Sequence, residues 1–441
     1  MTTITSLPAE IQRQCINYLD TVALKAIRLT SQAFRDIATE ALFDVATLDR
    51  TEESVDKFDT IINNDNLRRY IRTLHLGASS SIHYIFEECY PNYPPKWWEE
   101  AVARWDDIAL PNVKKILLDT AYACANSQCA SFELAFAKLI SRANVNTLTI
   151  KHLQDSCRLI SLDIAHLPTV PKELHLLITT LTHEPSPDMD IELRHRHAFF
   201  NNRLNAEWLK PMQPELTHLT LHCNTYWGVY PRWQPGDLRF PALKSLAFGK
   251  WTIAFDWQIA FITAHAQTLQ QLILTDCPIL HASRMTPRQH DNAWATRLPG
   301  TSRGKPPTVN AFCALRWHRV LADFQRSLRK LRHFAMGRGS VGAVFWGEAD
   351  GSVDDAFDAR YGLAPRIDGS RYTIFDFGEG PVGSSRAGAS YLAQPEGPGA
   401  GWKWLQKETD EDVRRMVEFP ECLEEDQAAL ESLLGVLRGR V

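Results

Sequence analysis

The sequence predicts an N-terminal module of three short helices, an irregular solenoid of helix–strand repeats behind it, and a loop-rich C-terminal cap. Apolar residues at helical spacing fill the N-terminal residues, and an apolar motif with the period of a strand then recurs along the chain. Glycine-rich stretches become frequent near the C-terminus. The predicted fold class is therefore an α+β or α/β solenoid, divided into residues 1–48, 49–340 and 341–441.

The composition excludes several classes of protein. It is 44% hydrophobic and 23% charged with a net charge of −4, and this near-neutral balance lacks the basic stripe that marks nucleic-acid binding. No run reaches the roughly 20 apolar residues needed to span a bilayer, and the N-terminus lacks the pattern of a secretory signal. Nine cysteines without a C-x-x-C pair predict reduced thiols in the cytoplasm or nucleus. We expect neither a nucleic-acid nor a membrane partner.

An apolar stripe near the N-terminus predicts the first helix. Its members recur every four residues, with Ile16 beside them, and are Leu7, Ile11, Cys15 and Leu19. Pro8 suits the first helical position, where its missing N–H costs nothing, and Glu10 complements the positive end of the helix.

Two further helices follow the first one. Asp20 and Thr21 interrupt the stripe and are expected to cap a second helix, whose apolar residues are Leu24, Ile27 and Leu29. Ser31 is the expected N-cap of a third helix, whose apolar face consists of Phe34, Ile37, Ala38, Ala41 and Leu42. A short extended stretch comes next, at residues 43–48.

These helices allow two interpretations. A unit this small cannot bury all of its apolar side chains internally, so it needs support from elsewhere. It is either a helical cap on the following domain or a docking module whose exposed stripe binds another protein in the manner of a helix in a groove. The physical pattern alone favours neither.

The N-terminal residues resemble the F-box of many filamentous-fungal proteins over the string LPAEIQRQCINYLDTVALKAIRLTSQAFRDIATEALF, about a tenth of the chain. The shared elements are Leu-Pro-x-Glu, then Leu-Thr-Ser-x-x-Phe-Arg-x-x-Ala, and a closing Leu-Phe. In that family the module binds a Skp-type adaptor, which links to a cullin. The resemblance implies that the adaptor contacts are Leu7, Pro8, Glu10, Ile11, Ile16, Leu19, Leu24 and Leu29. It also implies that Phe34 and Leu42 hold the three helices together.

A repeated motif predicts the solenoid. An apolar-x-x-apolar-x-apolar pattern recurs at Ile71/Leu74/Leu76, Val113/Ile116/Leu118, Val145/Leu148/Ile150, Leu216/Leu219/Leu221, Leu243/Leu246/Phe248, Leu269/Leu272/Leu274 and Leu331/Phe334/Met336, with a weaker copy at Leu174/Leu176. Several copies lie 26 to 27 residues apart, which is typical of leucine-rich repeats. Helical patterns precede some strands, at residues 51–62, at residues 131–143 and after Asp256, which is the expected cap of its helix. A doubly wound sheet is the alternative architecture.

A second block supports the first resemblance. Phe240 to Leu280 is similar to a block behind the F-box in many of the same fungal proteins, with Leu-Lys-Ser-Leu, Asp-Trp-Gln and Leu-x-x-Leu-x-Leu-x-x-Cys-Pro in order. The pattern then stops at about residues 281–310, which we expect to be an insertion. Terminal helices are predicted at residues 410–417 and 421–437. The stripe of the second helix is expected to cap the last repeats and consists of Leu430, Leu433, Leu434 and Leu437.

Several motifs could suggest catalysis or ligand binding. The glycines from Gly337 to Gly342 fit G-x-G-x-x-G, but no helical pattern follows them, as a nucleotide site requires. The pairs His195/His197 and Cys124/Cys129 lack further ligands at recognisable spacing. Most of the thirteen tryptophans are expected in the core, and the sequence does not single out one that faces a substrate. We therefore expect no cofactor, no metal and no catalytic residue.

The two resemblances imply a non-catalytic, substrate-recognition subunit of an SCF-type cullin-RING ubiquitin ligase. The F-box would bind the Skp-type adaptor and, through it, a cullin, while the solenoid would bind a target protein. The alternative is an F-box scaffold that acts outside a ligase. A third hypothesis, an enzyme with an unrecognised site, would require a perturbed acid–base pair in a cleft.

Overall fold

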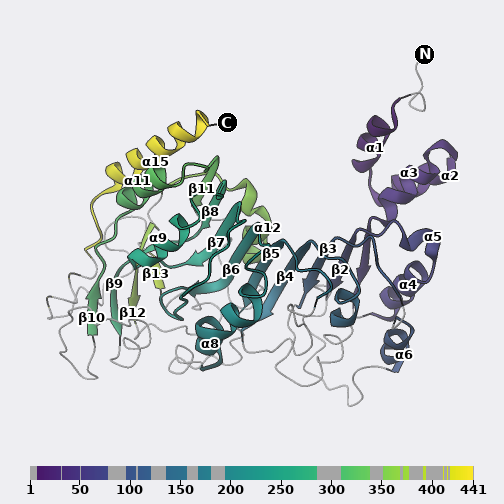
Figure 1. Cartoon of the computed structure of the whole chain (residues 1–441), viewed down its shortest axis with the longest axis horizontal. Coiled ribbons are helices and arrows are strands. Elements are labelled where there is room, and N and C mark those ends of the chain that lie inside the picture. Colours follow the sequence, from purple (N-terminus) through teal and green to yellow (C-terminus); the bar gives the residue numbers. More distant parts are fainter. Residues whose placement is uncertain are drawn as a thin grey trace. The chain divides into compact units, whose positions relative to one another are not determined.

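The computed structural model describes residues 7–30, 32–49, 51–77, 96–105, 108–120, 136–155, 167–179, 194–285, 309–337, 351–367, 371–376, 391–393, 411, 415 and 418–440 (Figure 1). The chain divides into two compact units. The first comprises Met1–His152 and Leu159–Pro171, and the second comprises Leu153–Arg158 and Lys172–Val441. These units do not follow the three segments expected from the sequence, whose boundaries stay predictions. No helix among the described residues has the length and apolar character needed to cross a bilayer.

The first unit contains a parallel sheet whose strands follow one another in chain order. They are β1 (Val45–Leu48), β2 (Thr73–Gly77), β3 (Lys115–Asp119) and β4 (Thr147–Gln154), of which β4 belongs to this unit up to His152. The register places Leu74 beside Ile116, and Ile116 beside Leu148. The same apolar position of each predicted motif therefore lies in one row across the sheet.

A repeated turn sets this register. The carbonyl of Asp44 accepts the backbone N–H groups of Arg72 and Thr73, and the carbonyl of Arg72 accepts those of Lys114 and Lys115. The next turn uses the carbonyl of Lys114 in the same way. In each repeat one carbonyl accepts hydrogen bonds from two backbone N–H groups of the next repeat. Successive strands therefore pair without a shift in register.

Short helices lie between successive strands of this unit. They are α4 (Glu52–Ile62), α5 (Asp65–Arg68) and α6 (Lys96–Arg104). The hydroxyl of Thr51 accepts the N–H of Ser54 at 3.2 Å and so caps α4, whose buried side chains are Val55, Phe58 and Ile62. The helix predicted at residues 51–62 is confirmed. Of the helix predicted at residues 131–143, residues 131–135 lie outside the described part.

The parallel strands of the second unit also follow one another in chain order. They are β5 (Glu173–Thr179), β6 (His218–Trp227), β7 (Ser245–Trp251), β8 (Gln271–Thr275) and β11 (His333–Gly337). The buried row across β6, β7, β8 and β11 is Leu219, Leu246, Leu272 and Phe334. All eight predicted motifs are confirmed as strands. A doubly wound sheet reverses its strand order at a switch point, and the described strands of neither unit do so.

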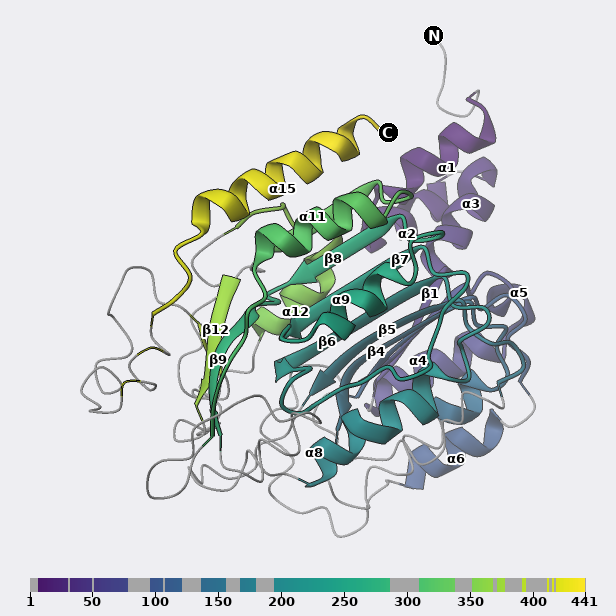
Figure 2. The same cartoon turned by 60° about the vertical axis from the view of Figure 1, so that its left-hand side comes forward.

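Helices pack on one face of the parallel strands of the second unit. Figure 2 shows α9 (Asp256–Thr263) and α11 (Trp317–Ser327) over this face, with α15 (Leu423–Arg438) packed along α11. A further helical segment consists of α8 (Arg194–Ala198) and the π-helix Phe199–Leu209. The predicted C-terminal helix is confirmed as α15, with Leu430, Leu433 and Leu437 buried. Of the helix predicted at residues 410–417, only residues 411 and 415 are described.

The start of α9 differs from the prediction. Its N-cap is Phe255, and Asp256 is the first helical residue, so the expected cap role of Asp256 is wrong. Gln258 takes that role instead, because its Oε1 accepts the N–H groups of Ala254 at 2.7 Å and Phe255 at 3.0 Å. Its amide nitrogen also donates to the Thr252 carbonyl.

A second, mixed sheet of the second unit was not predicted. Its strand order is β10 (Val309–Phe312), β9 (Ile279–Met285), β12 (Tyr372–Asp376) and β13 (Tyr391–Ala393). Strand β9 thus extends into the segment 281–310 that was expected to be an insertion, while residues 286–308 lie outside the described part. The expectation failed because β9 pairs with β12, which is far away in the sequence.

A segment from the C-terminal region covers the other face of the parallel strands of the second unit. This segment consists of α12 (Gly351–Asp358) and the 3-10 turn Ala359–Gly362. Phe357 packs against Leu177, and the Arg360 Nε donates to the Thr220 hydroxyl at 3.2 Å. Successive side chains of a strand point to opposite faces, so Thr220 lies on the face opposite to Leu219 and Leu221. The segment therefore covers the strand face that the helices leave open.

Candidate functional site

The candidate site lies on three N-terminal helices, α1 (Ala9–Asn17), α2 (Thr21–Thr30) and α3 (Gln32–Phe43). The sequence predicted all three. Pro8 is the N-cap of α1 and stands one residue earlier than expected. The Asp20 carboxylate accepts the N–H of Ala23 at 2.7 Å, which confirms the predicted cap of the second helix. The side chain of Ser31, the expected cap of the third helix, lies outside the described part.

One face of each helix forms a small common core. Its buried members are Ile16, Leu24, Phe34 and Ala38, with Leu19, Ile27, Ile37, Ala41 and Leu42 packed against them. The predicted apolar face of the third helix is confirmed in full. Phe34 and Leu42 hold the helices together, as expected. Nine side chains make a modest core, which agrees with the limited stability of a unit of this size.

The opposite side of α1 and α2 presents apolar side chains to solvent. Ile11 is 41% exposed and Tyr18 90% exposed, while Val22 is 75% and Leu29 87% exposed. Each pair is seven residues apart, a spacing that places both members on the same face of a helix. Cys15 and Ala26, the residues between them at the fourth position, are also exposed. We call the two stripes together the apolar outer face.

This concentration is specific to the N-terminal module. Of the seven exposed large apolar side chains in the described part of the chain, Ile11, Tyr18, Val22, Leu29 and Val45 belong to residues 11–45. The other two are Tyr361 and Leu423. Single exposed apolar residues are normal on a protein surface, whereas a clustered set marks a contact site. The arrangement favours docking of a partner over a cap role inside the chain.

The eight residues predicted to contact an adaptor occupy three different environments. Pro8, Glu10, Ile11 and Leu29 are exposed, and Leu7 and Leu19 are half-buried. Ile16 and Leu24 are only 3% and 7% exposed and lie in the common core, so their observed contacts are internal. Tyr18 and Val22 were not predicted as contacts, although Tyr18 lies seven residues after Ile11 and Val22 seven residues before Leu29. Adaptor contact stays a prediction for all eight.

Charged side chains connect the module to the first strands. Glu40 pairs with Arg72 at 2.9 Å and with Arg13 at 3.6 Å, and Arg72 also pairs with Asp44 at 3.5 Å. These residues border a cavity of about 420 Å³ whose apolar side includes Leu19. Exposed pairs of this kind contribute little stability individually, so this connection is weaker than the internal core.

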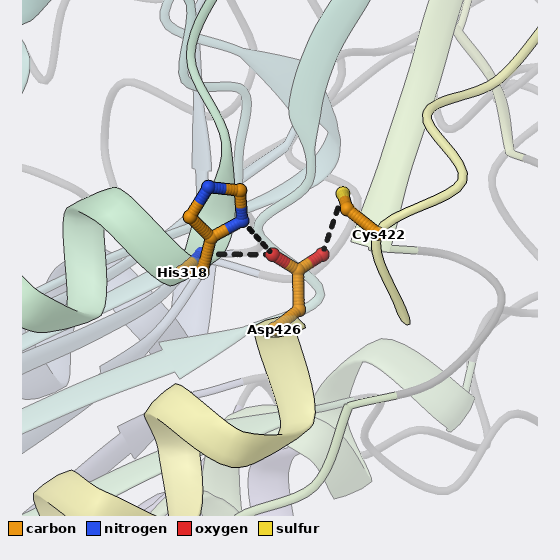
Figure 3. Close-up of side chains that lie close together, drawn as sticks. All are labelled: His318, Cys422 and Asp426. Carbon is orange, nitrogen blue, oxygen red and sulfur yellow. Dashed lines mark hydrogen bonds and ion pairs between the residues drawn. The ribbon is translucent and has the colours of Figure 1, made fainter. Parts of the chain in front are cut away.

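A separate cluster in the second unit could in principle hold a metal or act in catalysis. Figure 3 shows Asp426 between His318 and Cys422, and the three offer ligand atoms within 4.8 Å of one another. The carboxylate of Asp426 accepts hydrogen bonds from the His318 backbone at 2.8 Å, from the Tyr372 hydroxyl at 3.0 Å and from the Cys422 thiol at 3.4 Å. It also pairs with the Arg371 guanidinium at 3.1 Å. A cation would have to displace these donors and face a neighbouring positive charge.

The same cluster does not form a nucleophile pair. Burial raises the pKa of the Cys422 thiol, and the Asp426 charge adds to this effect, so the sulfur stays protonated at neutral pH. The thiol donates to a carboxylate, whereas an activated cysteine needs an imidazole or another cation as its partner. The cluster is a hydrogen-bonded centre that fixes the start of α15.

The other sequence motifs give no ligand site among the described residues. His197 packs its ring against Tyr230, with 4.6 Å between ring centroids, and the side chain of its partner His195 lies outside the described part. Gly337 ends β11, while the rest of the G-x-G-x-x-G segment and the pair Cys124/Cys129 are also outside it.

Comparison with known proteins agrees with the position of the candidate site. The family model described as the F-box domain matches residues 4–45. No curated protein matches the chain significantly. The chain therefore contains an F-box domain at its N-terminus, and this domain coincides with α1, α2 and α3.

Proposed function

We propose that this chain is the substrate-recognition subunit of an SCF-type cullin-RING ubiquitin ligase. The F-box implies binding to a Skp-type adaptor. The finer parts of the proposal are the link through that adaptor to a cullin, the capture of a target protein by the remainder of the chain, and residence in the cytoplasm or nucleus. Proteins with an F-box are in general non-catalytic adaptors, so we assign the chemistry of ubiquitin transfer to other subunits.

The apolar outer face carries the adaptor-binding part of the proposal. Its four largest side chains, Ile11, Tyr18, Val22 and Leu29, leave apolar area in water that a partner would bury. Burial of apolar area is worth about 25 cal/mol per Å², so a face of this kind gains stability when it is covered. The small internal core makes the module itself depend on such cover.

We further propose that the strands behind the F-box form an irregular leucine-rich-repeat-like array that receives the target. Within each unit the parallel strands are added in chain order with one apolar row in register, and a repeated carbonyl turn joins them in the first unit. An array of this kind offers an extended surface on which a partner can bind. The resemblance of Phe240–Leu280 to a block of fungal F-box proteins supports the same assignment.

The proposed mechanism is an increase in effective concentration. The adaptor would hold the F-box at one end of the ligase, and the array would hold a target lysine near the ubiquitin-charged enzyme. Tethering converts an encounter between free proteins into an intramolecular step, with effective concentrations in the range of about 1 mM for short flexible connections. This chain would then accelerate transfer by positioning alone.

Co-purification tests the proposal. The full chain should bring down a Skp-type adaptor, and the combined changes Leu7→Ala, Pro8→Ala and Ile11→Asp should abolish this. Unchanged adaptor recovery with that variant would remove the assigned face. Cullin and ubiquitin conjugates in the same sample would support the ligase, whereas adaptor alone would support a scaffold outside a ligase.

A further inference from the structure

Trp257 stands apart from most of the tryptophans in the described part of the chain. Seven of the nine described there are buried to less than 5% exposure: Trp98, Trp105, Trp208, Trp227, Trp233, Trp251 and Trp317. Trp257 and Trp97 are half-buried. Trp257 lies in the first turn of α9, whose buried side is formed by Gln258, Ile259, Phe261 and Ile262. Its indole therefore lies beside the buried face of the helix and reaches solvent.

A cavity of about 280 Å³ adjoins this indole. Besides Gln234, its walls are Pro235, Gly236, Arg239, Trp257, Ala260 and Phe261. Sites for whole cofactors or drug-sized ligands usually measure roughly 300–1,000 Å³. The cavity in the second unit suits one or two side chains of a bound protein segment better than a larger molecule.

The walls of the cavity are fixed before any partner binds. The amide nitrogen of Asn205 donates to the carbonyl of Gln234 at 2.6 Å, and its oxygen accepts the Trp233 indole N–H at 2.7 Å. A turn follows in which the N–H of Leu238 donates to the carbonyl of Pro235 at 3.0 Å. These bonds connect the loop to buried Trp233, so little ordering would be needed on binding.

The helix side of the cavity is held equally firmly. The ring of Trp257 stacks on Phe255, with 5.6 Å between centroids and 17° between planes. Phe261, on the next turn of α9, meets Trp233 edge-to-face at 5.5 Å. Both walls therefore rest on the same aromatic core.

The rim of the cavity carries one positive charge. Arg239 is exposed and is the single charged residue among the lining residues. Its Nη1 donates to the carbonyl of Leu238 at 2.7 Å, and no described carboxylate forms an ion pair with it. The hydrogen bond holds the guanidinium in place but leaves its charge uncompensated.

We infer that this cavity, the Trp257 pocket, binds a segment of the target protein that presents an apolar side chain next to an acidic residue. The apolar side chain would lie against Trp257 and Pro235, and the carboxylate would pair with Arg239. Tryptophan and arginine are the residues that most often dominate binding energy in protein interfaces. The inference rests on the proposed function as a target receptor and assigns its recognition site to the helix side of the second unit.

A phage-displayed library of random heptapeptides tests the pocket. It would be panned on the full chain, purified with its adaptor, and on the variants Trp257→Ala and Arg239→Glu. The unmodified chain should enrich an apolar residue beside Asp or Glu, and synthetic peptides of that sequence should bind Trp257→Ala at least about tenfold more weakly. Arg239→Glu should select Lys or Arg in place of the acidic residue.

Trp97→Ala provides the matched control, since Trp97 is the other half-buried tryptophan and lies in the first unit. It should leave the selected sequences and affinities unchanged. The inference is overturned if no sequence is enriched, if Trp257→Ala binds as well as the unmodified chain, or if Arg239→Glu keeps the acidic preference. Loss of adaptor co-purification with peptide binding intact would instead count against the proposed ligase role alone.

Discussion

Arg371 and Asp426 form an ion pair inside the second unit, with 3.1 Å between Nε and Oδ2 and side-chain exposures of 6% and 0%. The pair connects the residue before β12 to α15, and Asp426 also accepts a hydrogen bond from the backbone N–H of His318 at the start of α11. One carboxylate therefore joins three segments that are far apart in the sequence.

Loss of the Asp426 carboxylate should strongly destabilise the second unit. Asp426→Ala leaves the Arg371 guanidinium buried without a counter-charge, and breaking a buried pair in this way costs about 3–5 kcal/mol. Urea denaturation should show this loss in the free energy of unfolding of the second unit. Glu431→Ala, an exposed change on the same helix, should stay within about 0.5 kcal/mol. Equal effects of the two changes would contradict the role of Asp426.

Gly249 should not tolerate a side chain. A Cβ at this position would overlap the buried His222 ring on the neighbouring strand. Gly249→Ala should therefore destabilise the chain by about 1–3 kcal/mol, as overpacking of a core does.

Gly435→Ala is the matched control for this prediction. A Cβ at Gly435, inside α15, meets nothing within 4 Å. Because alanine favours a helix over glycine, this change should stabilise the chain by about 0.5–1 kcal/mol. Thermal unfolding of both variants gives the comparison, and a lower melting temperature for Gly435→Ala than for Gly249→Ala would refute it.

Two buried histidines predict sensitivity to acid. Burial, with smaller contributions from Lys250 and Arg360, lowers the pKa of His222 to about 3. Burial, followed by the charges of Arg360 and His218, lowers the pKa of His175 to about 3 as well. In the unfolded chain both titrate near pH 6.5. Between these values the unfolded state binds protons that the folded state does not.

The stability contributed by neutral His222 and His175 is therefore complete above about pH 6.5 and decreases as the pH falls toward 3. Each histidine can lower the free energy of unfolding by at most about 1.4 kcal/mol per pH unit. Urea midpoints measured from pH 7 to pH 5 should fall, and His222→Gln should reduce that slope. An unchanged slope in the variant would show that His222 is not responsible.

The strands could be predicted because their pattern is local. Leu74, Ile116, Leu148 and Leu219 each occupy the same place in a motif of alternating apolar residues, and alternation is sufficient to identify the buried side of a strand. The three F-box helices were predictable for the same reason, since Phe34 and Leu42 follow helical spacing.

The remaining features depend on contacts between remote residues. Strand β9 was mistaken for part of an insertion because its partner β12 lies far along the chain. The role of Asp426 requires Arg371 and His318 to meet it, and no sequence spacing indicates this. The cavity beside Trp257 requires the loop from Gln234 to Arg239, which Asn205 anchors from another helix.

The candidate site was predicted in position but only partly in its residues. On the first two helices both faces carry apolar side chains, so spacing alone did not separate the core face of Ile16 from the outer face of Tyr18. The seven-residue spacing shared by Ile11–Tyr18 and Val22–Leu29 was the available signal. It becomes informative once the core of α3 shows which side of α1 and α2 is covered.

The affinity of the full chain for a purified Skp-type adaptor tests the central claim most directly. The combined variant Ile11→Asp, Val22→Asp and Leu29→Asp alters exposed positions only, so the chain should fold with an unchanged melting temperature. Calorimetric titration should show a loss of at least about 2 kcal/mol, or roughly thirtyfold in Kd, as expected for interface hot spots. Leu423→Asp, an exposed leucine at the start of α15, should bind the adaptor like the unmodified chain. Adaptor affinity that is unchanged in the triple variant would contradict docking through the apolar outer face.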